Sequence, residues 1–399
     1  MAKPSRLAVR RLSVALAVLL CSGVLALEPA WQGGTDTRAI EFPDTSAYRT
    51  LAVDLHTHSV FSDGEVWPSI RVREAIRDGL DAMAVTEHLE YQPHLADIPH
   101  PDRNRSFELA RGGVPNQSDL VVIPGSEITR GQPYGHMNAV FVQDANALLR
   151  VDGPFEAGNP ADFRRQASQW PAQAVVDAAN AQGAFVFWNH SWSQFGDAKT
   201  AINEFHRDNA ASGKLHGIEV ANGATYSEES FRIALDHNLT LVGVSDIHGL
   251  IDWQHEPHRG GHRPVTLVFA EEHSADAIRR ALFDRRTVVW FENLLIGRAP
   301  ELMPLLEASL RVSARYPGDA PLLNVAIRNA SDARFQLRNR TDFTMVGDHD
   351  IVEVPPHAEV MLRVRTGDRL DRVQLEFDVL NALTAPDTHP VVRFDVRPN

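Results

Sequence analysis

The chain has almost no cysteine, little lysine and no excess of positive charge. Its single cysteine, Cys21, lies in a segment that we expect to be removed, so the remaining chain can form neither disulfides nor thiolate metal sites. Lys+Arg 39 against Asp+Glu 52 gives a formal net charge of −13, which argues against stable binding to duplex nucleic acid. Any metal site must therefore use histidine and carboxylate ligands.

Long apolar runs are also scarce, and the one near the N-terminus is typical of a secretory signal peptide. Basic residues from Lys3 to Arg11 precede an apolar run over 12–20, with Val24 and Ala26 placed for cleavage. The run is shorter than the roughly 20 residues that span a bilayer. We therefore expect a signal peptide at 1–26, a linker at 27–49, export to the periplasm or the exterior, and no membrane span after signal removal. The sequence does not determine the oligomeric state.

From about residue 50, short apolar runs alternate with helix-like stretches, which is typical of an α/β fold with parallel strands. Strands are expected at 50–55, 82–85, 120–124, 137–142, 184–188, 217–220, 240–244, 265–269 and 287–290, with helices such as 69–77, 171–181 and 274–284 between them. Near Gly297 the pattern changes to alternating apolar and polar residues. The segment 298–399 is therefore expected to form an all-β sandwich of roughly 100 residues, with its first strand at 306–316.

Polar side chains that can bind metals follow these strands. Of the 18 histidines, 15 fall between His56 and His273. The pair His56 and His58 directly follows the first strand, at the end where α/β barrels build active sites. Later strand ends carry Glu87 and His88, Glu127, His190, Asp246 and His248, while Asp63 lies in a turn sequence and His136 opens a strand.

Each of these histidines taken singly could be an ordinary buried residue bonded to the backbone. Several histidines and carboxylates at one end of a barrel are costly to bring together without a cation, because burial and mutual repulsion disfavour their charges. Nitrogen and oxygen ligands without sulfur suit zinc, manganese or iron. The sequence therefore predicts two or three divalent metal ions.

Six sequence blocks in order resemble the PHP superfamily, the polymerase and histidinol phosphatase domain. They are DLHTHSVFSDG (54–64), VTEH (85–88), PGSEI (124–128), GHMNAVF (135–141), WNH (188–190) and SDIH (245–248). The resemblance covers about residues 50 to 295. It implies a distorted (β/α)7 barrel, which we expect at 50–297, followed by the small all-β domain at 298–399.

The resemblance also implies ligand sets. One metal would take His56, His58, Glu127 and Asp246, a second would share Glu127 and add His136 and His190, and a third would use Asp63, His88 and His248. Glu87 stands where many family members have aspartate, a change that we do not expect to remove a ligand.

These sets imply a metal-dependent phosphoesterase, either a phosphatase or a phosphodiesterase, that acts on a small anionic ester. A water held between the metals would attack phosphorus. Asp246 is a candidate for giving the leaving group a proton. Arg130 and Arg263 are candidates for binding the substrate, since a guanidinium matches phosphate oxygens.

Three alternatives remain open. The same fold and metals could hydrolyse carboxylic esters, carbamates or amides. An amidohydrolase barrel also begins with His-x-His, but it usually bridges its metals with a modified lysine, and neither Lys199 nor Lys214 follows a convincing strand. The protein could also be a non-catalytic metal- or ligand-binding protein in which the C-terminal domain is the working part.

Overall fold

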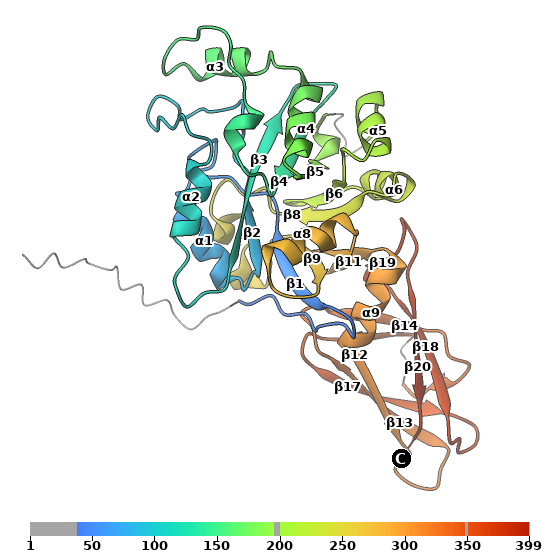
Figure 1. Ribbon diagram of the computed structural model, residues 1–399. Helices are drawn as coiled ribbons and strands as arrows, with labels where there is room; N and C mark the ends of the chain where they lie inside the picture. Colours follow the sequence, from blue (N-terminus) through green and yellow to red (C-terminus); the bar gives the residue numbers. More distant parts are fainter. Residues whose placement is uncertain (1–37, 195–199, 348–349, 399) are drawn as a thin grey trace, which may run out of the picture. The chain divides into compact units, whose positions relative to one another are not determined.

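The structure is a computed structural model that describes residues 38–194, 200–347 and 350–398 (Figure 1). The predicted signal peptide and the first part of the predicted linker lie outside the described residues. Within the described ranges, none of the helices has the length and apolar character needed to cross a membrane.

The first part of the chain is built on a 12-stranded sheet of order β19-β11-β10-β9-β1-β2-β3-β4-β5-β6-β7, with β8 paired to β6. The strands are β1 (Arg49–Asp54), β2 (Ala82–Val85), β3 (Val121–Thr129), β4 (His136–Val140), β5 (Phe185–Trp188), β6 (Gly217–Asn222), β7 (Thr225–Tyr226), β8 (Thr240–Val244), β9 (Val265–Ala270), β10 (Thr287–Phe291), β11 (Leu294–Gly297) and β19 (Ala382–Leu383).

The directions of these strands make an irregular barrel, in which β4 and β9 each run antiparallel to their neighbours. Strands β1, β2 and β3 are parallel to one another, as are β5, β6 and β8, whereas β4 runs antiparallel between β3 and β5. A parallel bridge between Thr57 and Ile247 joins the ends of β1 and β8. The distorted barrel that the sequence predicts is therefore confirmed.

Helices and short helical turns connect the strands (Figure 1). They are α1 (Pro68–Arg77), α2 (Arg105–Gly112), η1 (Ala145–Leu148), α3 (Pro160–Ala167), α4 (Ala172–Ala181), η2 (Ser191–Gln194), α5 (Glu204–Ala211), α6 (Glu228–Asp236), α7 (Ile251–Gln254), η3 (Pro257–Arg259) and α8 (Ala275–Phe283). The Ser274 side chain caps α8 by accepting a hydrogen bond from the Ala277 amide. One apolar stripe of α8, including Ile278 and Leu282, is buried.

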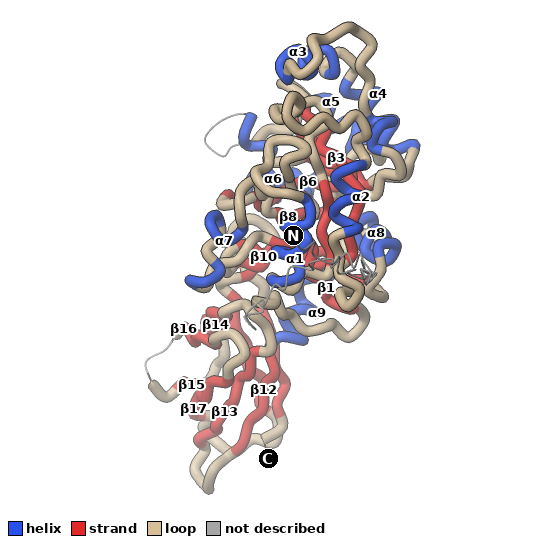
Figure 2. The backbone as a smooth tube through the Cα atoms, turned by 90° about the vertical axis from the view of Figure 1, so that its left-hand side faces the viewer, coloured by secondary structure: helices blue, strands red, loops and turns tan. Residues whose placement is uncertain are grey.

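The last part of the chain begins with α9 (Ala299–Ser309) and continues as two four-stranded antiparallel sheets. One has the order β12-β13-β17-β15 and the other β16-β14-β18-β20. Figure 2 shows β12, β13 and β17 side by side. The strands are β12 (Leu310–Arg315), β13 (Leu322–Asn329), β14 (Phe335–Asn339), β15 (Thr344–Met345), β16 (Ile351–Val354), β17 (Glu359–Arg365), β18 (Val373–Val379) and β20 (Val391–Val396).

Alternate residues of these strands form the core between the sheets. In β13, Leu323, Val325 and Ile327 are buried while Arg328 is exposed, as expected for strands with one face toward a core. The predicted all-β domain is confirmed.

One expected strand in this region is wrong in part. Residues 306–309, which we expected to begin a strand at 306–316, are the last residues of α9. Leu302, Leu305 and Leu306 are buried at helical spacing, and a proline lies in the first turn, where it is tolerated. Strand β19 also lies in the C-terminal segment but pairs with β11 of the barrel sheet.

Candidate metal centre

The candidate ligands meet at the carboxyl ends of the parallel strands. His56 and His58 follow β1, His88 follows β2, and Asp246 and His248 follow β8, while Glu127 lies within β3. A bridge between His88 and Glu127 continues the pairing of β2 and β3. His136 is the first residue of β4 rather than a residue after it, but it pairs with Thr129 near the end of β3. The antiparallel direction of β4 therefore brings His136 to the same edge.

The tightest group contains the four ligands expected for the first metal. The Nε2 atoms of His56 and His58 are 3.0 Å apart. Each lies 3.1 Å from Asp246 Oδ1, and they lie 3.4 and 3.3 Å from Glu127 Oε2. All four side chains thus present ligand atoms to one another in a buried position.

The other candidate ligands surround this group. Glu127 Oε1 is 2.9 Å from His136 Nδ1 and 3.5 Å from His190 Nε2. On the other side, Asp63 lies 3.3 Å from His88 Nε2 and 3.1 Å from His248 Nε2. His88 Nδ1 also approaches Glu127 Oε2 at 2.8 Å, so Glu127 contacts histidines of every expected set.

Hydrogen bonds at the far ring nitrogens determine which nitrogen of each imidazole is free. His56 Nδ1 lies 2.7 Å from the carboxylate of Glu219, so it carries the hydrogen and Nε2 keeps a lone pair when the ring is neutral. The Ser62 hydroxyl donates to Glu87 and so accepts from His58 Nδ1, which leaves Nε2 of His58 in the same state. Two lone pairs 3.0 Å apart repel each other unless a proton or a cation lies between them.

The carboxylates of the cluster also have oxygens that no hydrogen bond uses. Among the described residues, these oxygens are Glu127 Oε2, Asp246 Oδ1 and Asp63 Oδ1, and all are buried. Buried polar atoms without partners are rare and costly. Since imidazole nitrogens and carboxylate oxygens suit divalent zinc, manganese or iron, the residues present fit a metal centre.

Protonation of the cluster follows from the same contacts. Burial disfavours the charged imidazolium of His88, but the neighbouring carboxylates of Glu127 and Asp63 outweigh burial and raise its pKa to about 10. The pKa of Asp246 is lowered despite burial, because His56, His58 and His190 stabilise its anion. Metal binding must therefore displace protons from the histidines.

The two loops that carry Asp63 and Asp246 have constrained backbones. A Cβ on Gly64 would lie 2.6 Å from the Ser59 amide nitrogen, so only glycine fits beside Asp63. Asp246 has a positive φ of 50°, in the left-handed region that aspartate tolerates better than most residues. Glu87 accepts hydrogen bonds from the amide of Ser59 and the hydroxyl of Ser62, so it supports the His58 loop.

Several supporting residues escaped the sequence analysis. Glu219 on β6 is fully buried, and its second oxygen accepts from the His190 amide at 2.6 Å. Asn222 donates both to Glu219 and to Asp246 Oδ2, at 2.9 and 3.1 Å. Asn189 donates to Glu127 Oε1 at 3.0 Å. A charged residue inside the apolar run GIEVAN was the signal that could have revealed Glu219.

Replacing Glu219 with glutamine is expected to weaken metal binding about 10- to 100-fold, the usual effect of losing an outer partner of a metal-bound histidine. In one orientation, the NH2 group of the new glutamine would face the donors of His190 and Asn222, and in the other it would face the donor of His56. In both cases two donors would face each other and a hydrogen bond would be lost. Competition with a chelator measures the affinity. Glu307→Gln on the exposed face of α9 is the matched control, and equal metal retention in both variants would contradict the role of Glu219.

The two arginines proposed for the substrate are buried in ion pairs. Arg263 is 1% exposed, and its guanidinium contacts Asp78 at 2.7 Å and Asp54 at 3.2 Å. Arg130 is buried and pairs with Glu90 at 3.0 Å. Both guanidinium groups pair with buried carboxylates, although Arg130 Nε has no hydrogen-bond partner among the described residues.

Another arginine has free donors beside the cluster. Nε and Nη1 of Arg103 have no hydrogen-bond partner among the described residues. Arg103 lines a cavity of about 10 Å³ together with His88 and His100, which is room for a single oxygen atom. Burial lowers the pKa of Arg103 to about 10, so it remains a cation at neutral pH.

The C-terminal part of the chain is similar to a known protein family. A family model described as an Ig-like domain matches residues 310–395. A search of curated proteins found no match. PsfC from Pseudomonas syringae is 17% identical, with a TM-score of 0.40, over 65% of this chain and 96% of PsfC.

A crystal structure from Bacteroides vulgatus is much more similar. It is a two-domain protein containing a predicted PHP-like metal-dependent phosphoesterase. It is 37% identical to the chain with a TM-score of 0.80, and the match covers 91% of this chain and 100% of that one. The chain therefore belongs to the PHP superfamily of metal-dependent hydrolases, in which it has the two-domain architecture.

Proposed function

We propose that the protein hydrolyses phosphoric esters of small molecules, as a phosphatase or phosphodiesterase, with two or three divalent cations bound in the cluster. The observation that carries the proposal is the approach of the Nε2 lone pairs of His56 and His58 to Asp246 Oδ1 and Glu127 Oε2. The description of the Bacteroides relative as a phosphoesterase supports the choice of bond.

The ligand sets in this proposal are those that the resemblance implied. His56, His58, Glu127 and Asp246 would hold one cation, and the histidines on either side would complete the other sites. When bound, the cations would neutralise phosphoryl oxygens and lower the pKa of an attacking water toward about 7. Glu127 is the residue common to the groups, since its two oxygens contact separate histidines.

The remaining chemistry is assigned to side chains at the open part of the cluster. His248 and His136 are 34% and 28% exposed, so substrate would enter at this side. Asp246 is ionised because its neighbouring histidines lower its pKa, and it is therefore a better ligand than a proton donor. Arg103 would bind a phosphoryl oxygen through Nε and Nη1, which are buried but have no hydrogen-bond partner among the described residues, whereas two carboxylates engage Arg263.

We further propose the domain division 50–297 and 298–399 and export through the N-terminal segment 1–26. The basic start, the short apolar run and the small residues Val24 and Ala26 support export. N-terminal sequencing of secreted protein tests the proposal, with a mature start at Leu27 as the expected result.

The function is tested by elemental analysis and by hydrolysis of three chromogenic substrates, namely a phosphomonoester, a phosphodiester and a carboxylic ester, with added Mn²⁺ or Zn²⁺. We expect bound metal and turnover of a phosphoester. Arg103→Ala should raise KM for that phosphoester about tenfold, the cost of one charge-assisted hydrogen bond. Turnover of the carboxylic ester alone would favour the ester, carbamate or amide alternative. Bound metal without turnover would favour a binding protein.

A further inference from the structure

A second, larger cavity lies beside the metal centre. It has a volume of about 700 Å³, within the range of small-molecule sites. Trp290 of β10 lies in its wall and pairs with Val265, the first residue of β9. The next residue of β9, Thr266, pairs with Val53 near the carboxyl end of β1. The cavity is therefore at the same end of the barrel as the candidate ligands.

Two wall residues connect the cavity to the loop that carries Asp246 and His248. Gly223 donates its amide hydrogen to Val244 and follows Asn222, which donates to Asp246. On the other side, the side-chain amide nitrogen of Gln254 lies close to Gly249. It is 3.4 Å from the position that a Cβ atom would take on this glycine. Asn222 and Gly249 thus link two walls of the cavity to the loop that carries Asp246 and His248.

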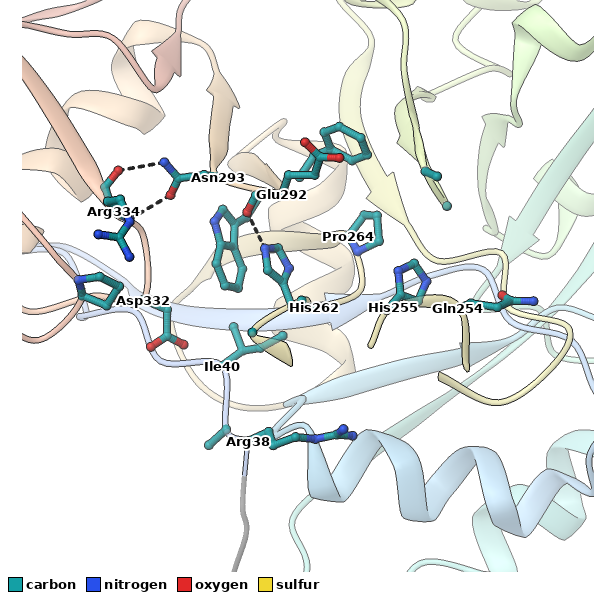
Figure 3. A pocket seen from close by; sticks show the side chains of 18 residues that line it. Arg38, Ile40, Gln254, His255, His262, Pro264, Glu292, Asn293, Asp332 and Arg334 are labelled. Carbon is teal, nitrogen blue, oxygen red and sulfur yellow. Dashed lines mark hydrogen bonds between the residues drawn. The ribbon is translucent and has the colours of Figure 1, made fainter. Parts of the chain in front are cut away.

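Residues from the C-terminal part of the chain form the opposite wall. Figure 3 shows Arg334 and Asp332 at one side of the cavity, Gln254 and His255 at the other, and His262 between them. Arg334 is held by two hydrogen bonds of 2.8 Å between its backbone and the side chain of Asn293. The position of this arginine is therefore determined by the hairpin of β10 and β11.

The free polar groups of the cavity determine what it can bind. Among the described residues, no side-chain hydrogen bond engages the Gln254 amide or the Glu292 carboxylate, and His255 Nε2 is buried without a partner. The nearest carboxylate to Arg334, on Glu353, is 4.0 Å away. Arg334, which makes only this long ion pair, and Glu292 carry opposite charges, so the cavity offers donors and acceptors without favouring a charged ligand.

The aromatic residue in the wall gives little surface for stacking. Trp290 is 5% exposed, because His262 stacks on it with ring centroids 3.4 Å apart and Phe42 packs against its edge. A flat aromatic ligand would find no open ring face there. Hydroxyl groups, by contrast, can both donate to Glu292 and accept from Gln254 and Arg334.

We propose that this cavity binds the leaving group of the substrate, and that this group is an uncharged polyhydroxylated ring of the size of a sugar, contacted by Gln254, His255 and Glu292 of the barrel and by Arg334 of the C-terminal domain. The assignment to a leaving group rests on the proposed phosphoesterase function. The C-terminal domain thereby contributes to substrate selection.

The first test measures binding without catalysis. Saturation-transfer NMR with free ribose and free glucose is applied to the full-length mature protein, to the double variant Gln254→Ala/Arg334→Ala, and to Arg328→Ala. Arg328 is exposed on β13 and is the matched control. We expect transfer to one of the sugars in the wild type and the control, and at least a fivefold smaller signal in the double variant, because two hydrogen bonds are lost.

The second test compares ribose 5-phosphate and glucose 1-phosphate with methyl phosphate, whose leaving group is too small to fill the cavity. We expect kcat/KM for a sugar phosphate to exceed that for methyl phosphate, and this ratio to fall about tenfold in the double variant. The absence of sugar binding, or equal binding by the double variant, would overturn the inference even if methyl phosphate is hydrolysed. Failure to hydrolyse any phosphoester would instead overturn the proposed function, while the NMR signal reports on the cavity separately.

Discussion

Replacing Glu127 with glutamine is expected to remove most of the bound metal and to lower kcat by more than about a hundredfold. This effect is larger than the roughly 10- to 100-fold loss that is usual for a residue that only hydrogen-bonds to a metal ligand. The side chain keeps its shape, and Asn189 can still donate to an amide oxygen. What is lost is the negative charge that contacts His88 at 2.8 Å and His136 at 2.9 Å. Elemental analysis and kinetics with a phosphoester measure both effects.

Glu359→Gln provides the control for this experiment. It makes the same chemical change at an exposed position on β17, far along the chain from Glu127. Circular dichroism of both variants should match the wild type, which separates loss of metal from loss of fold. Full metal content with unchanged turnover in Glu127→Gln would contradict the assignment of Glu127 as the shared ligand. The same measurements on His56→Ala should give a similar loss.

Replacing Arg263 with alanine is expected to lower the free energy of unfolding by about 3–5 kcal/mol, the range for breaking a buried ion pair. The variant leaves Asp54 buried without its cation and removes one of the three arginines that lie within 4.0 Å of Asp78. Urea unfolding of metal-free protein at pH 7 measures the loss. Because Asp54 also accepts hydrogen bonds from Ser245, next to Asp246, metal affinity should fall as well.

Arg232→Ala is the control for Arg263, because its ion pair with Glu228 is on the surface and contributes about 0–1 kcal/mol. The two roles considered for Arg263 give opposite results. A substrate ligand would raise KM and leave stability unchanged. That outcome would show that the buried guanidinium becomes accessible to substrate.

The strand pattern and the short motifs were accessible from the sequence. Apolar runs followed by histidines or carboxylates predict where each strand ends, because side chains beyond a buried strand no longer need to be apolar. The structure brings His56, His58 and Asp246 together at such ends, within 3.1 Å of one another. Their role as ligands remains a prediction for the metal measurements.

The residues that orient the cluster were less accessible. Glu219 lies in an apolar strand with no motif of its own, and its contacts with His56 Nδ1, the His190 amide and Asn222 identify its role. The end of the helix over 299–309 also fits the strand that we expect at 306–316, because the apolar residues of a short segment fit both periods.

The sequence by itself determined that the metal-binding side chains follow buried strands, since apolar periodicity is a local property of the chain. Only the tertiary structure decided which of them meet and in which environment. The antiparallel direction of β4 brings His136 to the cluster, and the surrounding elements bury Arg263 against Asp54 and Asp78. Strand direction and burial depend on contacts between residues far apart in the chain, so an arginine in sequence does not reveal whether it will face a substrate or a carboxylate.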